Sequence, residues 1–211
     1  IGDFVGKLVA GLIAKGHTPE EIHSLVTVKR RPAMEKIVDE VSDFLDRIGN
    51  IFQINRTTPF NPAQFLGSGW SIWKGPADGD GLSGEEDQDE RSLALTQLDL
   101  SQVQLVTCLK EGETSITGEE RINRLKAANY IRLDAQVFLT LWENKHLIPE
   151  SWKERTNGNV TYIFFDGTPL RGPDGRRYVL CLYWYDSEWF WVCRWLGNDW
   201  RGIDPSAVLA S

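Results

Sequence analysis

The chain has 211 residues, of which 41% are hydrophobic and 25% are charged, and this composition excludes disorder as the dominant state. A formal net charge of −7 and only three cysteines argue against a basic nucleic-acid-binding protein and against a disulfide-built scaffold. No apolar run approaches the roughly 18–20 residues of a membrane helix, so we expect a soluble, cytoplasmic protein without a membrane partner.

The N-terminal residues 1–54 predict a helical segment of three amphipathic helices. Apolar residues recur at helical spacing over residues 3–15. Thr18-Pro19-Glu20-Glu21 has the pattern of a capping box, which predicts a short second helix. A third apolar pattern with the same spacing runs over residues 32–48.

A basic cluster, Lys29, Arg30 and Arg31, lies between the second and third predicted helices. A short capped helix, a turn and a longer helix have the proportions of a helix-turn-helix, which makes a nucleic-acid-associated protein an alternative function. However, residues 1–56 carry eight basic and eight acidic side chains and are therefore neutral. Packing or protein interaction is the favoured role of this segment, and a nucleic-acid partner is not expected.

Residues 75–90 predict an exposed acidic loop, because they consist mainly of Gly, Pro, Asp and Glu. The beginning Asp78-Gly79-Asp80 resembles a calcium-binding loop. The pattern then fails, because Leu82 stands where a ligand oxygen is needed and Asp89 stands where glutamate is needed. We therefore expect no metal site in this loop.

Residues 55–211 predict an α+β domain with a mostly antiparallel sheet and two packed helices. The helices are expected over residues 119–128 and 135–144, after the capping residues Thr117 and Asp134. Asp166-Gly167 has the sequence of a hairpin turn. The expected strands are residues 93–98, 103–109, 130–133, 160–165, 168–171, 177–185 and 188–196.

The last two strands form a tryptophan-rich hairpin with a two-residue turn at Asp186-Ser187. This turn sets Tyr185 opposite Glu188, and all later pairs follow from it. In that register Cys181 and Cys193 point to opposite faces, so we expect three free thiols.

The aromatic surface of this hairpin is the leading candidate binding site. Exposed aromatic patches commonly bind sugars, bases or peptides, whereas buried ones form core. We expect the tryptophan face to be mainly core, with Trp191 buried and the tryptophans nearest the turn partly exposed. The candidate ligand-binding residues are Trp184, Trp189, Tyr183, Tyr185 and Arg194.

The sequence contains no recognisable motif for catalysis, phosphate binding or zinc binding. The three histidines, His17, His23 and His146, lack the spacing of metal ligands, so we expect no metal and no cofactor. Carboxylates are plentiful, however, and a hydrolase with an unrecognised carboxylate site stays open as an alternative. A pair of buried carboxylates in one cleft would favour it.

Several aromatic features of residues 60–211 occur together. They are Phe60-Asn61-Pro62, Gly69-Trp70-Ser71-Ile72-Trp73, Ile148-Pro149-Glu150-Ser151-Trp152-Lys153, Tyr162-Ile163-Phe164-Phe165-Asp166-Gly167 and the tryptophan-rich hairpin. In these features the chain resembles uncharacterised bacterial proteins. The resemblance implies a shared module with a more variable N-terminal attachment, and it implies no activity. The leading hypothesis is a non-enzymatic binding or interaction module whose partner is another protein or a small ligand.

Overall fold

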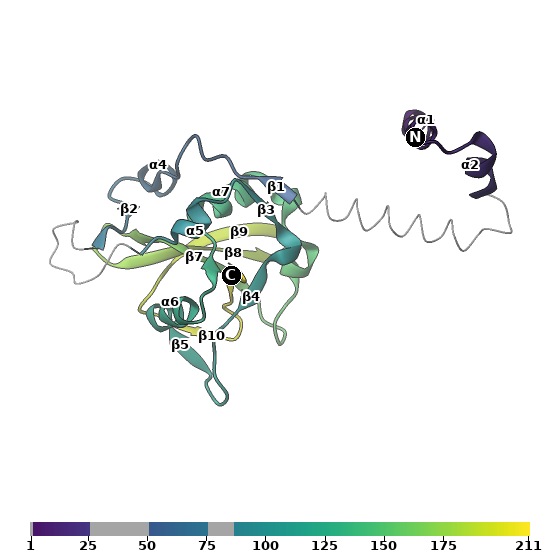
Figure 1. Ribbon diagram of the computed structural model, residues 1–211. Helices are drawn as coiled ribbons and strands as arrows, with labels where there is room; N and C mark the ends of the chain where they lie inside the picture. Colours follow the sequence, from purple (N-terminus) through teal and green to yellow (C-terminus); the bar gives the residue numbers. More distant parts are fainter. Residues whose placement is uncertain (1, 26–50, 76–86) are drawn as a thin grey trace. The chain divides into compact units, whose positions relative to one another are not determined.

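The computed structural model describes residues 2–25, 51–75 and 87–211 (Figure 1). The chain divides into two compact units, residues 1–49 and residues 50–211. The third predicted helix and the basic cluster Lys29, Arg30 and Arg31 lie outside the described residues.

The first unit contains helices α1 (Gly2–Ala14) and α2 (Pro19–Leu25). Gly16 ends the first helical stretch with a left-handed φ of 92°, which favours glycine. The predicted capping box is present at α2, where the Glu21 backbone N–H donates to Thr18 Oγ1 at 3.2 Å. In return, the Thr18 backbone N–H donates to Glu21 Oε2 at 2.9 Å. These bonds satisfy two donors that the start of a helix leaves free.

The second unit is an α+β structure built on one large sheet, in agreement with the predicted fold class. The strand order is β4-β11-β7-β8-β9, while β2 adds to β7 and β6 adds to β11. The pairing of β11 with β7 is parallel, and the other described pairings are antiparallel. The strands are β2 (Ser71–Ile72), β4 (Gln104–Val106), β6 (Ile131–Arg132), β7 (Tyr162–Arg171), β8 (Arg177–Tyr185), β9 (Glu188–Trp195) and β11 (Ser206–Leu209).

Two small ladders flank the large sheet. Strand β1 (Ile51–Gln53) pairs with β3 (Gln97–Asp99), and β5 (Ser115–Thr117) pairs with β10 (Asp199–Arg201). The strand expected over residues 93–98 is wrong in its first part, because Asp89 caps a short helix there by accepting from the Arg91 backbone N–H. The short helices are α4 (Pro62–Leu66), α5 (Glu90–Leu93) and the 3₁₀ helices η3 (Leu100–Gln102), η4 (Lys145–Leu147) and η5 (Glu150–Lys153).

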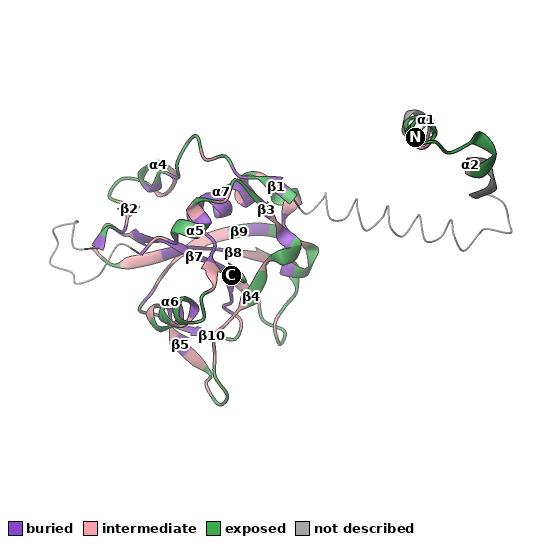
Figure 2. Cartoon of the chain, viewed as in Figure 1, coloured by how far each residue is buried: buried purple, intermediate pink, exposed green. Residues whose placement is uncertain are grey.

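The two longer helices pack on opposite faces of the large sheet (Figure 1). Helix α7 (Ala135–Glu143) packs on the face that carries Leu180 and Leu182. Helix α6 (Gly118–Ala127) packs on the face that carries Val179 and Cys181. This division follows from the alternation of side chains along β8. Buried residues are concentrated in β7, β8 and α7, which form the centre of the unit (Figure 2).

Strand β7 contradicts the predicted turn at Asp166-Gly167, because the strand continues through these residues with a bulge between Phe165 and Leu170. The Gly167 N–H donates to the Leu133 carbonyl at 2.9 Å, and the Gly167 carbonyl accepts from Asp89 N–H at 2.9 Å. These backbone partners keep the chain extended where the sequence pattern favours a turn.

The predicted register of the β8–β9 hairpin is confirmed, with Tyr185 opposite Glu188 and Trp184 opposite Trp189. Both turn residues, Asp186 and Ser187, have positive φ, of 49° and 64°, as the mirror-image two-residue turn requires. The three cysteines of the chain are free thiols, as expected.

The burial of two hairpin tryptophans is the reverse of the prediction. Trp189 is only 4% exposed and belongs to the core, whereas Trp191 is partly exposed. Trp189 packs against Trp184 at 5.3 Å between ring centroids, and Trp152 of η5 lies in the same core cluster. Trp184 is partly exposed, as predicted, so this face of the hairpin is covered at Trp189 but only partly at Trp184.

The acidic segment is not exposed at its C-terminal end, contrary to expectation. Asp87 and Asp89 are each only 6% exposed. Asp87 accepts from Arg177 Nη2 at 2.6 Å, and Asp89 Oδ2 accepts from the Arg132 backbone N–H at 3.0 Å. These carboxylates are buried because cations and backbone donors satisfy them. None of the helices among the described residues is long and apolar enough to cross a membrane.

Candidate functional site

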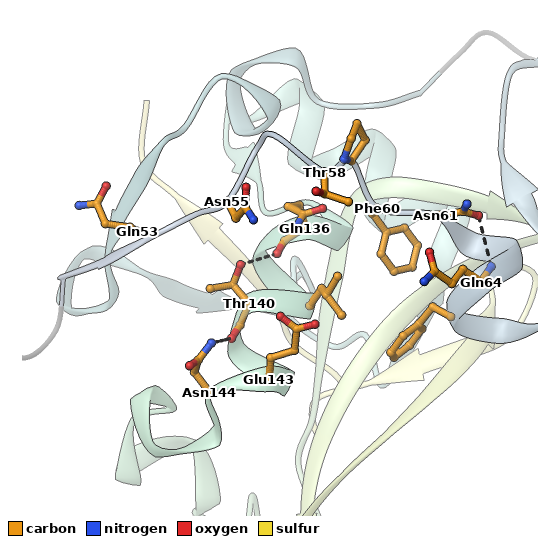
Figure 3. A pocket seen from close by; sticks show the side chains of 13 residues that line it. Gln53, Asn55, Thr58, Phe60, Asn61, Gln64, Gln136, Thr140, Glu143 and Asn144 are labelled. Atoms are coloured by element: carbon orange, nitrogen blue, oxygen red, sulfur yellow. Dashed lines mark hydrogen bonds between the residues drawn. The ribbon is translucent and has the colours of Figure 1, made fainter.

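A pocket of about 450 Å³ lies between the outer side of α7 and the segment that leads from β1 to α4 (Figure 3). We call it the amide pocket, after the side chains that dominate its wall. Its volume falls within the range of small-molecule binding sites.

The helical side of the amide pocket follows from the pattern of α7. Val137, Phe138 and Leu141 are fully buried and belong to the core cluster. The opposite side of the helix and its C-terminal cap present Gln136, Leu139, Thr140, Glu143 and Asn144 to the pocket. Their spacing is that of one helix face.

The segment from β1 to α4 forms the other wall, and it is fixed at both ends. At the first end β1 pairs with β3. At the second end Phe60 is buried and lies 5.7 Å from Phe65, whose ring lies 5.7 Å from Phe138 of α7. Asn61 caps α4 by accepting from the Gln64 backbone N–H at 3.2 Å. The chain is thus held over α7 by its ends, and the pocket lies under its middle.

The wall of the amide pocket is rich in neutral polar groups. Six carboxamides and two hydroxyls line it, together with one carboxylate and four apolar side chains. The described lining contains no lysine, arginine or histidine. The lining residues are Gln53, Asn55, Thr58, Pro59, Phe60, Asn61, Gln64, Phe65, Gln136, Leu139, Thr140, Glu143 and Asn144.

Several of these polar groups are oriented by bonds to the backbone. Thr140 Oγ1 donates to the Gln136 carbonyl, and Asn144 Nδ2 donates to the Thr140 carbonyl, both at 2.9 Å (Figure 3). Asn55 Oδ1 accepts from the Thr57 backbone N–H at 3.0 Å. Each of these side chains keeps further donor or acceptor capacity, since a carboxamide offers two donors and an acceptor with two lone pairs.

Gln136 is distinctive because it is only 8% exposed, and its Oε1 has no hydrogen-bond partner in the described part of the chain. It also borders a second pocket of about 220 Å³, which Phe60 lines as well. A buried amide oxygen is costly to leave unsatisfied, so a donor at this wall is favoured.

The second pocket is lined by an ion pair between partly buried Arg56 and buried Asp134. Asp134 Oδ1 accepts from the Gln136 backbone N–H at 2.7 Å and from Arg56 at 3.0 Å, while Oδ2 accepts from Arg56 at 2.9 Å and from Ser92 Oγ at 2.6 Å. The bond from the Gln136 N–H makes this carboxylate the cap of α7. The other bonds occupy its remaining lone pairs, so it is not available as a general base.

The structure divides the five predicted ligand-binding residues between two faces. Tyr183, Tyr185 and Arg194 lie on one face of the hairpin, whereas Trp184 and Trp189 lie on the other. They therefore cannot form one site. Trp184 is additionally covered by Lys153, whose Nζ lies 4.4 Å from its ring.

The face with Tyr183 carries a row of neighbouring rings across three strands, which we call the aromatic row; its members are Tyr162, Tyr183 and Phe190. The ring centroids of Tyr183 and Phe190 are 5.6 Å apart at an interplanar angle of 22°, and those of Tyr162 and Tyr183 are 4.9 Å apart. Phe190 is 36% exposed and neighbouring Tyr185 is 53% exposed. The Arg194 guanidinium lies 5.1 Å from the Tyr162 ring.

A third pocket, of about 230 Å³, borders this face and holds two carboxylates, Asp199 and Asp204. Asp204 is buried, and its Oδ2 accepts from the Arg201 backbone N–H at 2.8 Å, whereas Asp199 is exposed. This pocket therefore lacks the pair of buried carboxylates that would favour a hydrolase.

Two further charged side chains, Arg121 and Asp166, are buried outside the two pockets described above, and no hydrogen bond or ion pair joins them in the described part of the chain. Asp166 accepts from Ser206 Oγ, and burial raises the pKa of its carboxyl group. Burial lowers the pKa of Arg121, whose guanidinium packs 5.0 Å from the Trp200 ring. We assign both side chains to the core.

The cysteines do not provide an activated nucleophile. Burial raises the pKa of Cys193 to about 12, and it also raises the pKa of Cys108 and of Cys181. Raised values keep the thiols protonated, and the thiolate is the reactive form. Among the described residues no group of three or more His, Cys, Asp or Glu side chains is placed to hold a metal ion.

Comparison of the chain with protein-family models, with curated proteins and with solved structures found no significant match.

Proposed function

We propose that this protein is a binding module whose amide pocket takes an uncharged, polyhydroxylated ligand such as a sugar. The observation that supports it most directly is the composition of the wall, which combines six carboxamides and two hydroxyls with no cationic side chain.

The chemistry of this wall fits hydroxyl groups better than anions. A sugar hydroxyl both donates and accepts a hydrogen bond, and a carboxamide offers both functions within one planar group. Phosphate and carboxylate ligands are usually bound by arginine or lysine, which the described lining lacks. The apolar side chains of Phe60, Phe65 and Leu139 provide a surface for the C–H face of a sugar ring.

The single carboxylate in the wall, Glu143, adds a selectivity that can be tested. It is exposed and lies on the same helix face as Thr140. A ligand with an ammonium group would gain a charge-assisted hydrogen bond from it. An amino sugar is therefore expected to bind more tightly than its neutral counterpart.

The test is a binding screen by ligand-detected NMR with neutral sugars, amino sugars and sugar phosphates, followed by calorimetry on the best ligand. Gln64→Ala should weaken binding about fivefold to tenfold, as expected for one lost hydrogen bond to a neutral group. Glu143→Gln should remove the preference for the amino sugar and leave neutral-sugar binding nearly unchanged.

Gln104→Ala is the matched control, because Gln104 is an exposed glutamine on β4 that does not line the pocket. Binding that is lost equally in this control would contradict the assignment of the pocket. Preferential binding of the sugar phosphates would contradict the proposed ligand class.

The aromatic row is a second candidate site, favoured by the exposure of Phe190 and Tyr185. Stacked and accessible rings bind the apolar faces of sugars and peptides. With Tyr183 and Arg194 they retain the part of the predicted hairpin site that lies on one face. The same screen separates the two sites, because Phe190→Ala should abolish binding at the aromatic row and leave binding at the amide pocket intact.

A further inference from the structure

Strand β9 lies at one edge of the large sheet and pairs with β8 on its inner side. It is eight residues long, from Glu188 to Trp195. A long edge strand presents a row of backbone donors and acceptors that can pair with another strand.

The hairpin turn determines which backbone groups of β9 face outward. A two-residue turn makes Tyr185 and Glu188 a hydrogen-bonded pair, and hydrogen-bonded pairs then recur at every second residue. The backbone groups of Trp189, Trp191 and Cys193 therefore point away from β8. No other described segment bonds to the backbone of these three residues.

The usual features that prevent edge pairing are absent from β9. The strand contains no proline and no lysine, and its pairing with β8 is regular without a bulge. Its charged side chains are Glu188 at the first position and Arg194 near the end. Such an edge is suited to bind a further strand.

The charge pattern of β9 is complementary to itself in the antiparallel direction. If a second copy of β9 is placed antiparallel with Trp191 opposite its own equivalent, Glu188 of each copy lies opposite Arg194 of the other. Trp189 then lies opposite Cys193, so outward-facing backbone groups meet at every hydrogen-bonded position. Glu188 and Arg194 fall at non-hydrogen-bonded positions, where facing side chains are closest.

We propose that two copies of this chain pair through β9 in this register, forming a dimer with one continuous sheet. About six backbone hydrogen bonds join the two strands, and the two Glu188–Arg194 pairs fix the register. Phe190 of one copy lies opposite Val192 of the other, so the two aromatic rows become neighbours across the dimer axis.

The test is the molecular mass of the full chain in solution, measured by sedimentation or light scattering as the concentration is raised. The wild-type mass should rise toward twice that of one chain. Glu188→Arg and Arg194→Glu should each weaken the dimer about tenfold or more, because each puts like charges opposite one another at two places. The double exchange, Glu188→Arg with Arg194→Glu, should restore the dimer.

A second variant tests the backbone bonds themselves. Cys193→Pro removes an outward-facing N–H without removing a bond to β8, so it should abolish the dimer while circular dichroism shows a folded chain. A wild-type chain that stays monomeric would overturn the proposal. It would also be overturned by a dimer that neither the single charge reversals nor Cys193→Pro weakens, because that dimer would use another surface.

Discussion

Arg124 joins separate segments of the second unit through one guanidinium group. Its Nη2 donates to Glu113 Oε1 at 2.9 Å, its Nε donates to Glu120 Oε1 at 2.8 Å, and its Nη1 donates to the Cys108 carbonyl at 3.0 Å. The side-chain hydrogen bond from Arg124 is the main cause that lowers the pKa of Glu113 from 4.5 to about 2. The loop between residues 108 and 113 is thereby tied to α6.

The ion pair between Glu113 and Arg124 predicts that the stability of the fold depends on pH. Because the pKa of Glu113 is lower in the folded chain than in the unfolded one, the carboxylate adds stability above pH 4.5, and this contribution is lost as the pH falls toward 2. Glu113→Gln should therefore be less stable than the wild type at neutral pH, and the difference should shrink below pH 4.5. Urea unfolding at a series of pH values measures it.

Glu111→Gln provides the control, because Glu111 lies in the same turn and makes no bond to Arg124. A difference between wild type and Glu113→Gln that stayed constant from pH 7 to pH 2 would contradict the assignment of this pair. An NMR titration of the Glu113 carboxyl group reports the same pKa independently of stability.

Single residues were predictable from the sequence where their role is local. Thr117 and Asp134 cap α6 and α7 as expected, because a cap bonds to backbone groups only two or three residues away. Gln136 was missed, although it immediately follows the capping region. Its place in the pocket wall depends on Phe60 and Asn55, which are distant in sequence, and no local pattern reports such contacts.

At the scale of elements, β7 shows why a local turn signal can fail. Asp-Gly is a strong hairpin sequence, yet Gly167 lies within a strand beside β6. A Cβ atom at this position would come within 2.2 Å of the Arg132 carbonyl oxygen and 2.8 Å of the Leu133 carbonyl. The glycine is needed for the close approach of two backbones rather than for a turn.

Gly167→Ala is therefore expected to destabilise the chain by about 3 kcal/mol, because rigid backbone atoms must move to admit the methyl group. Gly202→Ala is the matched control, since no atom lies within 4 Å of the position that its methyl group would take and its φ is not positive. Thermal or urea unfolding measures both variants. Equal stability of the two would show that β6 and β7 are not packed as closely as the structure has them.

The hairpin of β8 and β9 was predictable in register because two residues of turn and strict alternation determine it. The burial of its tryptophans was not predictable. Trp189 is buried in the cluster that includes Trp152, while partly exposed Trp191 contacts Phe65 from α4 at 4.7 Å between ring centroids. The elements that decide these exposures come from elsewhere in the chain.

At the scale of the whole second unit, the fold class was predictable from local patterns, whereas the amide pocket depends on long-range packing. The α+β class and both longer helices follow from periodicity and caps, and the structure agrees with them. The amide pocket arises only when residues 53–65 lie over α7, a contact between segments that are distant in sequence. The density of Asn and Gln in that stretch is the one sequence signal that could have indicated a polar wall.

The buried carboxylate of Asp87 connects three elements of the second unit that are distant in sequence. It contacts Lys126 of α6, Arg132 of β6 and Arg177 of β8. Arg132 and Arg177 have further acceptors in Asp89 and Glu119, but Asp87 is the one carboxylate among the described residues that contacts all three cations. Removing its negative charge from this buried network is therefore costly.

Asp87→Asn should accordingly cost about 3 kcal/mol of unfolding free energy, although it preserves the shape of the side chain. Glu90→Gln is the control within the same segment, because Glu90 is exposed and should change stability little. Deleting residues 76–86 alone, which leaves Asp87 in place, should be tolerated far better than deleting residues 75–90, since only the longer deletion removes this network. Equal stability of the two deletions, measured by urea unfolding, would mean that Asp87 does not hold α6, β6 and β8 together.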